Sequence, residues 1–93
     1  MTFFLVDDAP GHGPVLHRHP YTETWVVLAG EVAIWADGEV VEGRPEDIVT
    51  VSAGTAHKFR ATGTERLRMV CIHASPRMIQ EDLPDDDPDW LSG

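Results

Sequence analysis

The sequence has a single cysteine, Cys71, among its 93 residues. One cysteine excludes an intrachain disulfide, and a lone thiol is typical of a reducing compartment, so we expect a cytoplasmic protein. No apolar stretch approaches the roughly 20 residues that a membrane-spanning helix needs. The first residues also lack the basic segment that opens a secretory signal. We therefore expect neither a signal peptide nor a membrane partner.

Positive charge is scarce as well. Seven Lys and Arg residues stand against 16 Asp and Glu residues, which gives a formal net charge of −9. Six of the acids lie in residues 81–93, a stretch without any base. No part of the chain offers the basic stripe that nucleic acid requires. We expect one domain over residues 1–80 and a solvated acidic tail over residues 81–93, with docking of the tail through Trp90 and Leu91 as the alternative.

Short runs of Val, Ile, Trp and Thr between turn residues dominate the chain, which is typical of an antiparallel sandwich or barrel. The predicted strands are 3–6, 14–18, 23–29, 31–36, 39–42, 48–51, 56–61 and 66–73. Asp37-Gly38 predicts a tight hairpin because glycine accepts a positive φ. One short helix is predicted over residues 77–83, with Ser75 as its cap and Pro76 at the first helical position. The predicted fold class is all-β, a jelly-roll or sandwich type of β-barrel to which the short C-terminal helix is an optional addition.

The predicted strands 23–29 and 31–36 are apolar on both faces. In a domain that buries only about 60% of its unfolded surface, an apolar outer face needs a cover. A second copy of the chain is the simplest cover, so we expect a homodimer. The alternative is that the N-terminal strand or the C-terminal helix folds over this face. The residues expected at the dimer interface are Val26, Leu28 and Trp35.

A cluster of metal-binding residue types lies near the start of the chain. His17 and His19 are two residues apart, so on a strand both side chains leave the same face. Glu23 opens the next predicted strand, and His57 begins a later one. If these strands are neighbours in a barrel, three imidazoles and one carboxylate converge. The alternative is a polar surface strand that binds nothing.

This donor set suits one divalent transition metal ion, and Fe, Mn, Ni, Cu and Zn all remain open. An octahedral ion held by four protein ligands keeps two open positions, where substrate or oxygen can bind. A tetrahedral Zn would use all four ligands and be a closed, structural site. The mixture of imidazole and carboxylate favours the open, reactive kind.

The spacing of this cluster resembles the first motif of the cupin superfamily, G-x5-H-x-H-x3-E-x6-G. Gly11, His17, His19, Glu23 and Gly30 match it at every specified position. The resemblance implies a jelly-roll β-barrel, also called a double-stranded β-helix, of six to eight strands that is often dimeric.

Residues 46–61 resemble the second cupin motif, G-x5-P-x-G-x2-H-x3-N, less completely. Gly54 and His57 match, whereas Glu46, Ser52 and Ala61 stand where the motif has glycine, proline and asparagine. None of these three departures is a metal ligand in the family. The two motifs together imply one mononuclear metal ion, and the implied ligands are His17, His19, Glu23 and His57.

Other residues are candidates for the chemistry around the ion. By alternation, His73 shares the inward face of strand 66–73, and it is either a second catalytic group or a core histidine with a satisfied partner. Tyr21 lies in the turn between ligands and either contacts substrate or simply packs. An apolar substrate pocket is expected, lined by Tyr21, Trp25, Val27, Ile34, Phe59, Met69 and Cys71.

These observations favour a metalloenzyme that acts on a small organic molecule. Dioxygenase-type chemistry on a phenolic or enolic substrate is preferred over isomerase or decarboxylase chemistry, with Glu23 as both ligand and base. Two alternatives stay open. The chain is a non-catalytic module that binds or senses a small molecule, or the metal is a closed structural site that stabilises a thin barrel.

Overall fold

A computed structural model describes residues 1–91, and within that range the chain forms strands and no helix. The all-β class is therefore confirmed. The elements are β1 (Thr2–Asp8), β2 (His17–Arg18), β3 (Glu23–Ala29), β4 (Glu31–Ala36), β5 (Glu39–Gly43), β6 (Ile48–Val51), β7 (His57–Thr62), β8 (Leu67–His73) and β9 (Glu81–Asp82). With no helix over residues 1–91, the described chain contains no helix that could cross a membrane.

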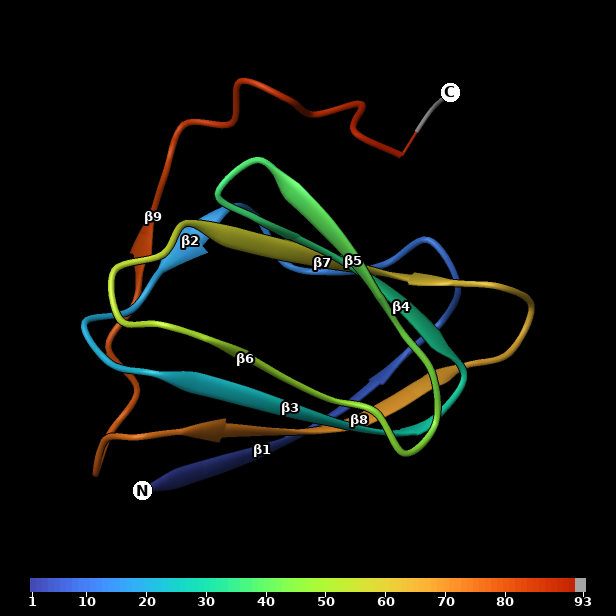
Figure 1. The fold of residues 1–93 in the computed structure, drawn as a ribbon, viewed down its shortest axis with the longest axis horizontal. Coiled ribbons are helices and arrows are strands. Elements are labelled where there is room, and N and C mark those ends of the chain that lie inside the picture. The colour runs from blue at the N-terminus through green and yellow to red at the C-terminus, as the bar shows by residue number, and fades with distance from the viewer. Residues whose placement is uncertain (92–93) are drawn as a thin grey trace.

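The strands form two antiparallel sheets that face each other (Figure 1). One has the order β1-β8-β3-β6, and the other has the order β5-β4-β7-β2-β9. The expected Asp37-Gly38 hairpin joins β4 to β5, and both turn residues have a positive φ, of 49° and 88°. The result is the jelly-roll barrel that the motif spacing implies.

The space between the sheets is filled with apolar side chains. Inward positions alternate along each strand, as the period of two requires. Full burial of one such side chain contributes about 1.5–3 kcal/mol to folding. The buried cluster consists of Trp25, Val27, Val32, Ile34, Val51, Phe59, Ala61, Leu67, Met69 and Cys71.

One turn of the barrel contains a strained backbone position. Glu46 has a φ of 79°, in the left-handed region where a Cβ is unfavourable. Its N–H donates to the carbonyl of Val27, which ties the turn to β3 at 2.9 Å. The cupin motif places a glycine at this position, so the departure from the motif has a conformational cost.

The helix predicted over residues 77–83 is wrong. Its backbone groups bond to distant parts of the barrel instead of to one another. The N–H of Leu83 donates to the carbonyl of Leu16 at 2.9 Å, and β9 pairs with β2. An isolated helix of seven residues is marginal in water, so these tertiary bonds override a weak local preference.

The acidic tail is not a free extension. The carboxylate of Asp85 accepts two hydrogen bonds from Lys58 Nζ, each of 2.8 Å, and the carbonyl of Asp87 accepts a third at 2.6 Å. Lys58 Nζ also lies 5.5 Å from the centre of the Trp90 ring. Most tail side chains remain exposed, but the tail docks on the five-stranded sheet through these contacts.

The two sheets have different outer faces. Val26 lies on the outer face of the four-stranded sheet, opposite Val70 and Ile48, and the neighbouring Leu28 is half exposed. Trp35 belongs to the other sheet, where it pairs with Lys58. Val26, Leu28 and Trp35 were expected at a single dimer interface, but they lie on two different faces of the barrel and cannot form one contiguous surface.

Candidate metal centre

Four side chains meet inside one end of the barrel: His17, His19, Glu23 and His57. Each contributes one ligand atom, and all of these atoms lie within 4.8 Å of one another. None of the four residues is more than 4% exposed. The pairing of β2 with β7 sets His17 directly opposite His57, and Glu23 opens β3 on the facing sheet. The strands thus bring together the four residues that were expected to converge.

Backbone carbonyls orient the three imidazoles. Each Nδ1 lies within hydrogen-bond distance of a carbonyl oxygen: that of Val15 for His17 at 2.6 Å, and that of Thr55 for His57 at 2.9 Å. His19 Nδ1 reaches the carbonyl of Ile79 at 2.6 Å. A carbonyl only accepts, so each Nδ1 carries the proton and a neutral ring presents the lone pair of Nε2 to the centre.

The donor set fits a divalent transition metal. Oε1 of Glu23 lies 3.0 Å from His19 Nε2 and 3.3 Å from His57 Nε2. When the imidazoles are neutral, Oε1 and both Nε2 atoms are hydrogen-bond acceptors, so none of them can donate to another. Glu23 Oε1 and His57 Nε2 are accordingly buried without a hydrogen-bond partner. Unpaired buried polar atoms are costly. A cation between them satisfies all four ligand atoms at once, and in its absence a proton on an Nε2 takes part of that role.

The protonation states suit metal binding. Burial lowers the pKa of His17, which keeps its imidazole neutral. Burial alone would raise the pKa of Glu23, but the close contact with His57 and the positive charge that His73, His57 or His19 carries when it is protonated outweigh burial, so the pKa of this carboxyl is lowered. A neutral imidazole and an ionised carboxylate are the ligand forms that a metal requires.

A second layer of contacts holds the other oxygen of the glutamate. His73 Nε2 lies 3.4 Å from Glu23 Oε2, and His73 Nδ1 lies 2.5 Å from Tyr21 Oη. The N–H of Ile79 donates to the same Oη at 3.3 Å. An ionised carboxylate only accepts, so Nε2 of a neutral His73 carries the proton that faces Glu23, and Nδ1 accepts from the hydroxyl of Tyr21. Both residues are buried, so His73 is a core histidine with satisfied partners that also contacts a ligand.

A cavity of 130 Å³ adjoins the cluster. Of the residues expected in the substrate pocket, Phe59 and Cys71 line it, and Tyr21 lies behind His73. Burial raises the pKa of the Cys71 thiol to about 12, so it is inert at neutral pH. Four others fill the barrel core and do not reach the cavity wall: Trp25, Val27, Ile34 and Met69.

The sequence pattern missed four cavity residues. Phe4 faces Cys71 in the β1–β8 register, so its alternation in strand 3–6 was a usable signal once the neighbouring strand was known. Pro14 precedes β2. Met78 and Gln80 belong to the segment predicted as helix and gave no local signal. All four lie on the cavity wall together with the ligands His17, His19 and Glu23.

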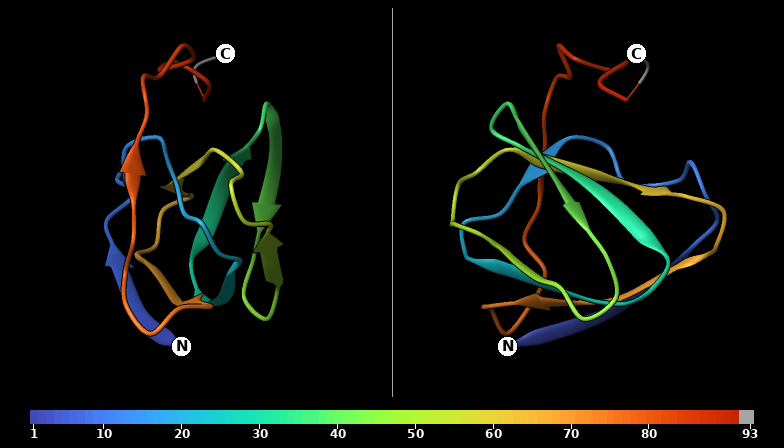
Figure 2. Two further views of the ribbon diagram at one scale, coloured as in Figure 1. Left: turned by 90° about the vertical axis from the view of Figure 1, so that its left-hand side faces the viewer. Right: turned by 45° about the vertical axis from the view of Figure 1, so that its right-hand side comes forward.

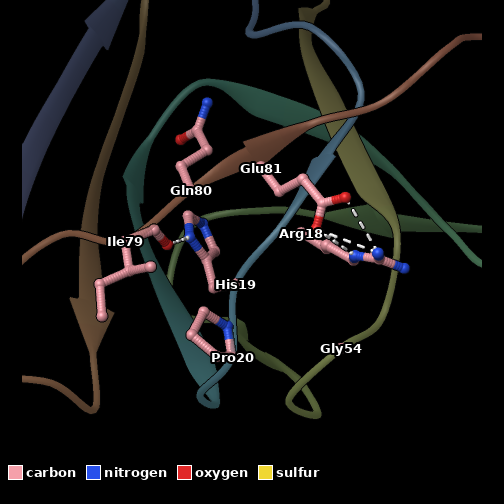
Figure 3. A pocket seen from close by; sticks show the side chains of 7 residues that line it. All are labelled: Arg18, His19, Pro20, Gly54, Ile79, Gln80 and Glu81. Carbon is pink, nitrogen blue, oxygen red and sulfur yellow. Dashed lines mark hydrogen bonds and ion pairs between the residues drawn. The ribbon is translucent and has the colours of Figure 1, made fainter.

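A larger hollow of 330 Å³ is lined by Arg18, His19, Pro20, Gly54 and residues 79–81 (Figure 3). Arg18 and Glu81 form an ion pair at its rim, and the carbonyl of Ile79 reaches the imidazole of His19. His19 and Gln80 line both the hollow and the cavity. Within this segment Gln80 therefore lines the cavity, and Ile79 contacts the candidate metal centre through His19.

The fold and this buried cluster define a small β-barrel of the jelly-roll type with a candidate metal centre. The family model described as "Cupin domain" matches residues 4–73, and the chain belongs to the cupin family. An uncharacterised double-stranded β-helix protein from Klebsiella pneumoniae has the same fold, with a TM-score of 0.79 and 24% sequence identity. That match covers 86% of this chain and 67% of the other.

Two curated relatives have names that bear on function. A 5-nitrosalicylic acid 1,2-dioxygenase of Bradyrhizobium is 34% identical over 69% of this chain and 31% of its own length. The polyketide synthase protein CurC of Streptomyces cyaneus is 37% identical over 72% of this chain and 44% of its own length. The chain thus spans less than half the length of either relative.

Proposed function

We propose that this cupin is a metal-dependent enzyme with dioxygenase-type chemistry on a small organic molecule. The observation that carries the proposal is the cavity beside the four ligands. A closed structural zinc site needs no adjoining space, whereas a catalytic ion keeps positions open for substrate. The dioxygenase name of the Bradyrhizobium relative supports the same chemistry.

The size and lining of the cavity favour a single aromatic ring. Its volume of 130 Å³ is close to that of engineered cavities of roughly 150 Å³ that hold benzene. Phe4, Phe59 and Met78 give it apolar walls, and the ligands form its polar end. A phenol or enol would place its ring between the apolar walls and its oxygen toward the ligands. A salicylate-like substrate meets both requirements.

In this proposal His17, His19, His57 and Glu23 Oε1 hold the ion, which supplies Lewis acidity and redox chemistry when bound. Oε2 of Glu23 accepts the proton that the substrate hydroxyl loses on binding. His73 contacts that oxygen and lines the cavity, so it stabilises the charge of the carboxylate and orients it.

The second candidate is a module that binds a small molecule and leaves it unchanged. The small size of the cavity favours this alternative. The two candidates predict different fates for the same ligand.

The test is to load the protein with Fe(II), Mn(II), Ni(II) or Cu(II) and to follow oxygen uptake over salicylates, catechols, flavonols and diketones. Turnover with one metal, lost in the His57→Ala variant, is the expected result. Binding of a ligand that is recovered intact, with no oxygen uptake for any metal, would establish the non-catalytic module instead.

A further inference from the structure

Residues 77–87 cross the open end of the barrel at the metal centre. They run from beyond the end of β8 past β2, where β9 pairs, and on to the five-stranded sheet (Figures 1 and 2). Their apolar side chains stay largely outside, since Met78 is 50% exposed and Ile79 is 40% exposed. A segment with so little buried apolar surface opens locally at a low free-energy cost. Its position depends on polar contacts.

Ile79 is the point where this segment touches the ligands. Its carbonyl accepts from His19 Nδ1 at 2.6 Å, and this bond selects the tautomer in which Nε2 faces the centre. Its N–H donates to Tyr21, which begins the chain of contacts through His73 to Glu23 Oε2. One peptide segment therefore orients two of the four ligands.

Two cations next to the ligands anchor the segment. Arg18, between two histidine ligands, forms hydrogen bonds of 3.0 Å to both carboxylate oxygens of Glu81. Lys58, directly after His57, is fully buried and bonds to Asp85. The exposed pair contributes little, but a buried ammonium needs its carboxylate, so Asp85 is the stronger anchor.

We propose that residues 77–87 act as a strap that positions His19 and Glu23, so that strap docking and metal binding stabilise each other. The inference rests on the proposed metal site. Coupling between two binding events is reciprocal. Loosening the strap must weaken metal binding, and metal must slow the opening of the strap by the same factor.

The first measurement is zinc affinity by competition with a chromophoric chelator, with Zn(II) itself as the probe. Asp85→Asn removes the charge that holds Lys58, and we expect its Kd for zinc to rise about 10-fold, within the range for lost outer contacts. Asp86→Asn is the matched control, because it removes the same charge one residue away at an exposed position. Its Kd should equal that of the wild type. Lys58→Met removes the anchor from the other side and should raise the Kd similarly.

The second measurement is amide hydrogen exchange of the wild-type protein with and without Zn(II). The amides of Ile79 and Leu83 bond across to the barrel, so their exchange reports strap opening. Zinc should slow both about 10-fold. Wild-type protein that binds no metal would overturn the proposed function together with the strap. Tight zinc binding that is unchanged in Asp85→Asn, with exchange at Ile79 unaffected by zinc, would overturn the strap alone.

Discussion

His17 and His57 face each other across the β2–β7 pair, with ring centres 4.3 Å apart. In the proposed site a metal links both motifs of the barrel, and we expect it to bind the folded chain, in which the four side chains converge. Metal at a concentration of 100 times its Kd therefore adds about 2.7 kcal/mol to the free energy of unfolding. For a domain of this size we expect the melting temperature to rise by roughly 10–20 °C.

Differential scanning calorimetry with and without Zn(II) or Mn(II) measures this shift. His57→Ala removes one ligand and should abolish most of it. A wild-type melting temperature that does not respond to any divalent transition metal would contradict the four-ligand site.

Glu23→Gln separates the metal site from the fold. The amide keeps the shape of the side chain and can donate a hydrogen bond to the Nε2 lone pair of His19, where the carboxylate oxygen cannot. We expect the metal-free variant to be more stable than the metal-free wild type by about 1 kcal/mol, the net contribution of a new hydrogen bond. Metal should no longer raise its melting temperature, because the anionic ligand is gone.

Urea unfolding of both metal-free proteins measures the difference, and metal titration of the variant supplies the control. Equal metal affinity in Glu23→Gln would show that the carboxylate is not a ligand.

Glu46→Gly should stabilise the barrel. The φ of 79° at Glu46 destabilises a residue with a Cβ by about 1–2 kcal/mol, and glycine removes this strain. Glycine also has more conformational entropy in the unfolded chain, which offsets about 0.5–1 kcal/mol of the gain. We expect a net gain of about 0.5–1 kcal/mol by urea unfolding. Glu42→Gly, within β5, is the matched control and should destabilise, because no positive φ is relieved there. Loss of stability in Glu46→Gly would show that the turn does not adopt this backbone conformation.

Tail docking should be lost in acid. The hydrogen bonds from Lys58, followed by that from the N–H of Asp87, lower the pKa of Asp85 below its ordinary value of 3.8. A carboxyl with a lowered pKa stabilises the docked tail above its unfolded pKa, and the effect disappears as the pH falls through the folded value. Docking is therefore expected to be constant from pH 8 to about 5 and to be lost progressively as the pH falls below 3.8.

The fluorescence of Trp90, taken as the difference between the wild type and Trp90→Phe, follows this transition because the indole lies beside Lys58. Asp85→Asn should remove the acid transition at Trp90. A transition that persists unchanged in this variant would assign it to another group.

We propose a homodimer through the outer face of the four-stranded sheet. Phe3, Leu5 and Ile48 are each 59% exposed or more on this face, in line with Val26, Val70 and Ile72. A contiguous apolar face of this kind marks an interface. Leu5→Glu should give a monomer in light scattering after size exclusion. Val40→Glu, exposed on β5 of the other sheet, should leave the dimer intact. A monomeric wild type at micromolar concentration would contradict the proposal.

Much of the barrel could be predicted from local signals. Alternation and turns placed strands 23–29, 31–36 and 48–51 at their observed bounds, and the others within a few residues. The buried cluster was predictable because His17, His19 and Glu23 are close in sequence and their spacing is specific. The prediction that His57 joins them required only that the strands carrying these residues be neighbours in the barrel.

What the sequence could not show depends on contacts between distant residues. Ile79 orients His19 through backbone groups, and a backbone group leaves no signal in the residue type. Alternation predicted inward-facing side chains correctly, yet it could not tell Trp25, in the packed core, from Phe59, on the cavity wall. The surroundings of Trp35 were not predictable either, because its neighbour Lys58 is covered by the C-terminal tail, whose path depends on contacts with distant residues.

The burial of Lys58 gives this chain an internal reporter. It is the only lysine of the 93 residues, and its amine lies under the tail. An amine-reactive reagent can modify this side chain only while the tail is lifted. The rate of its acylation therefore depends on how often the strap opens. Mass spectrometry of the peptide that contains Lys58 measures this rate without any engineered label.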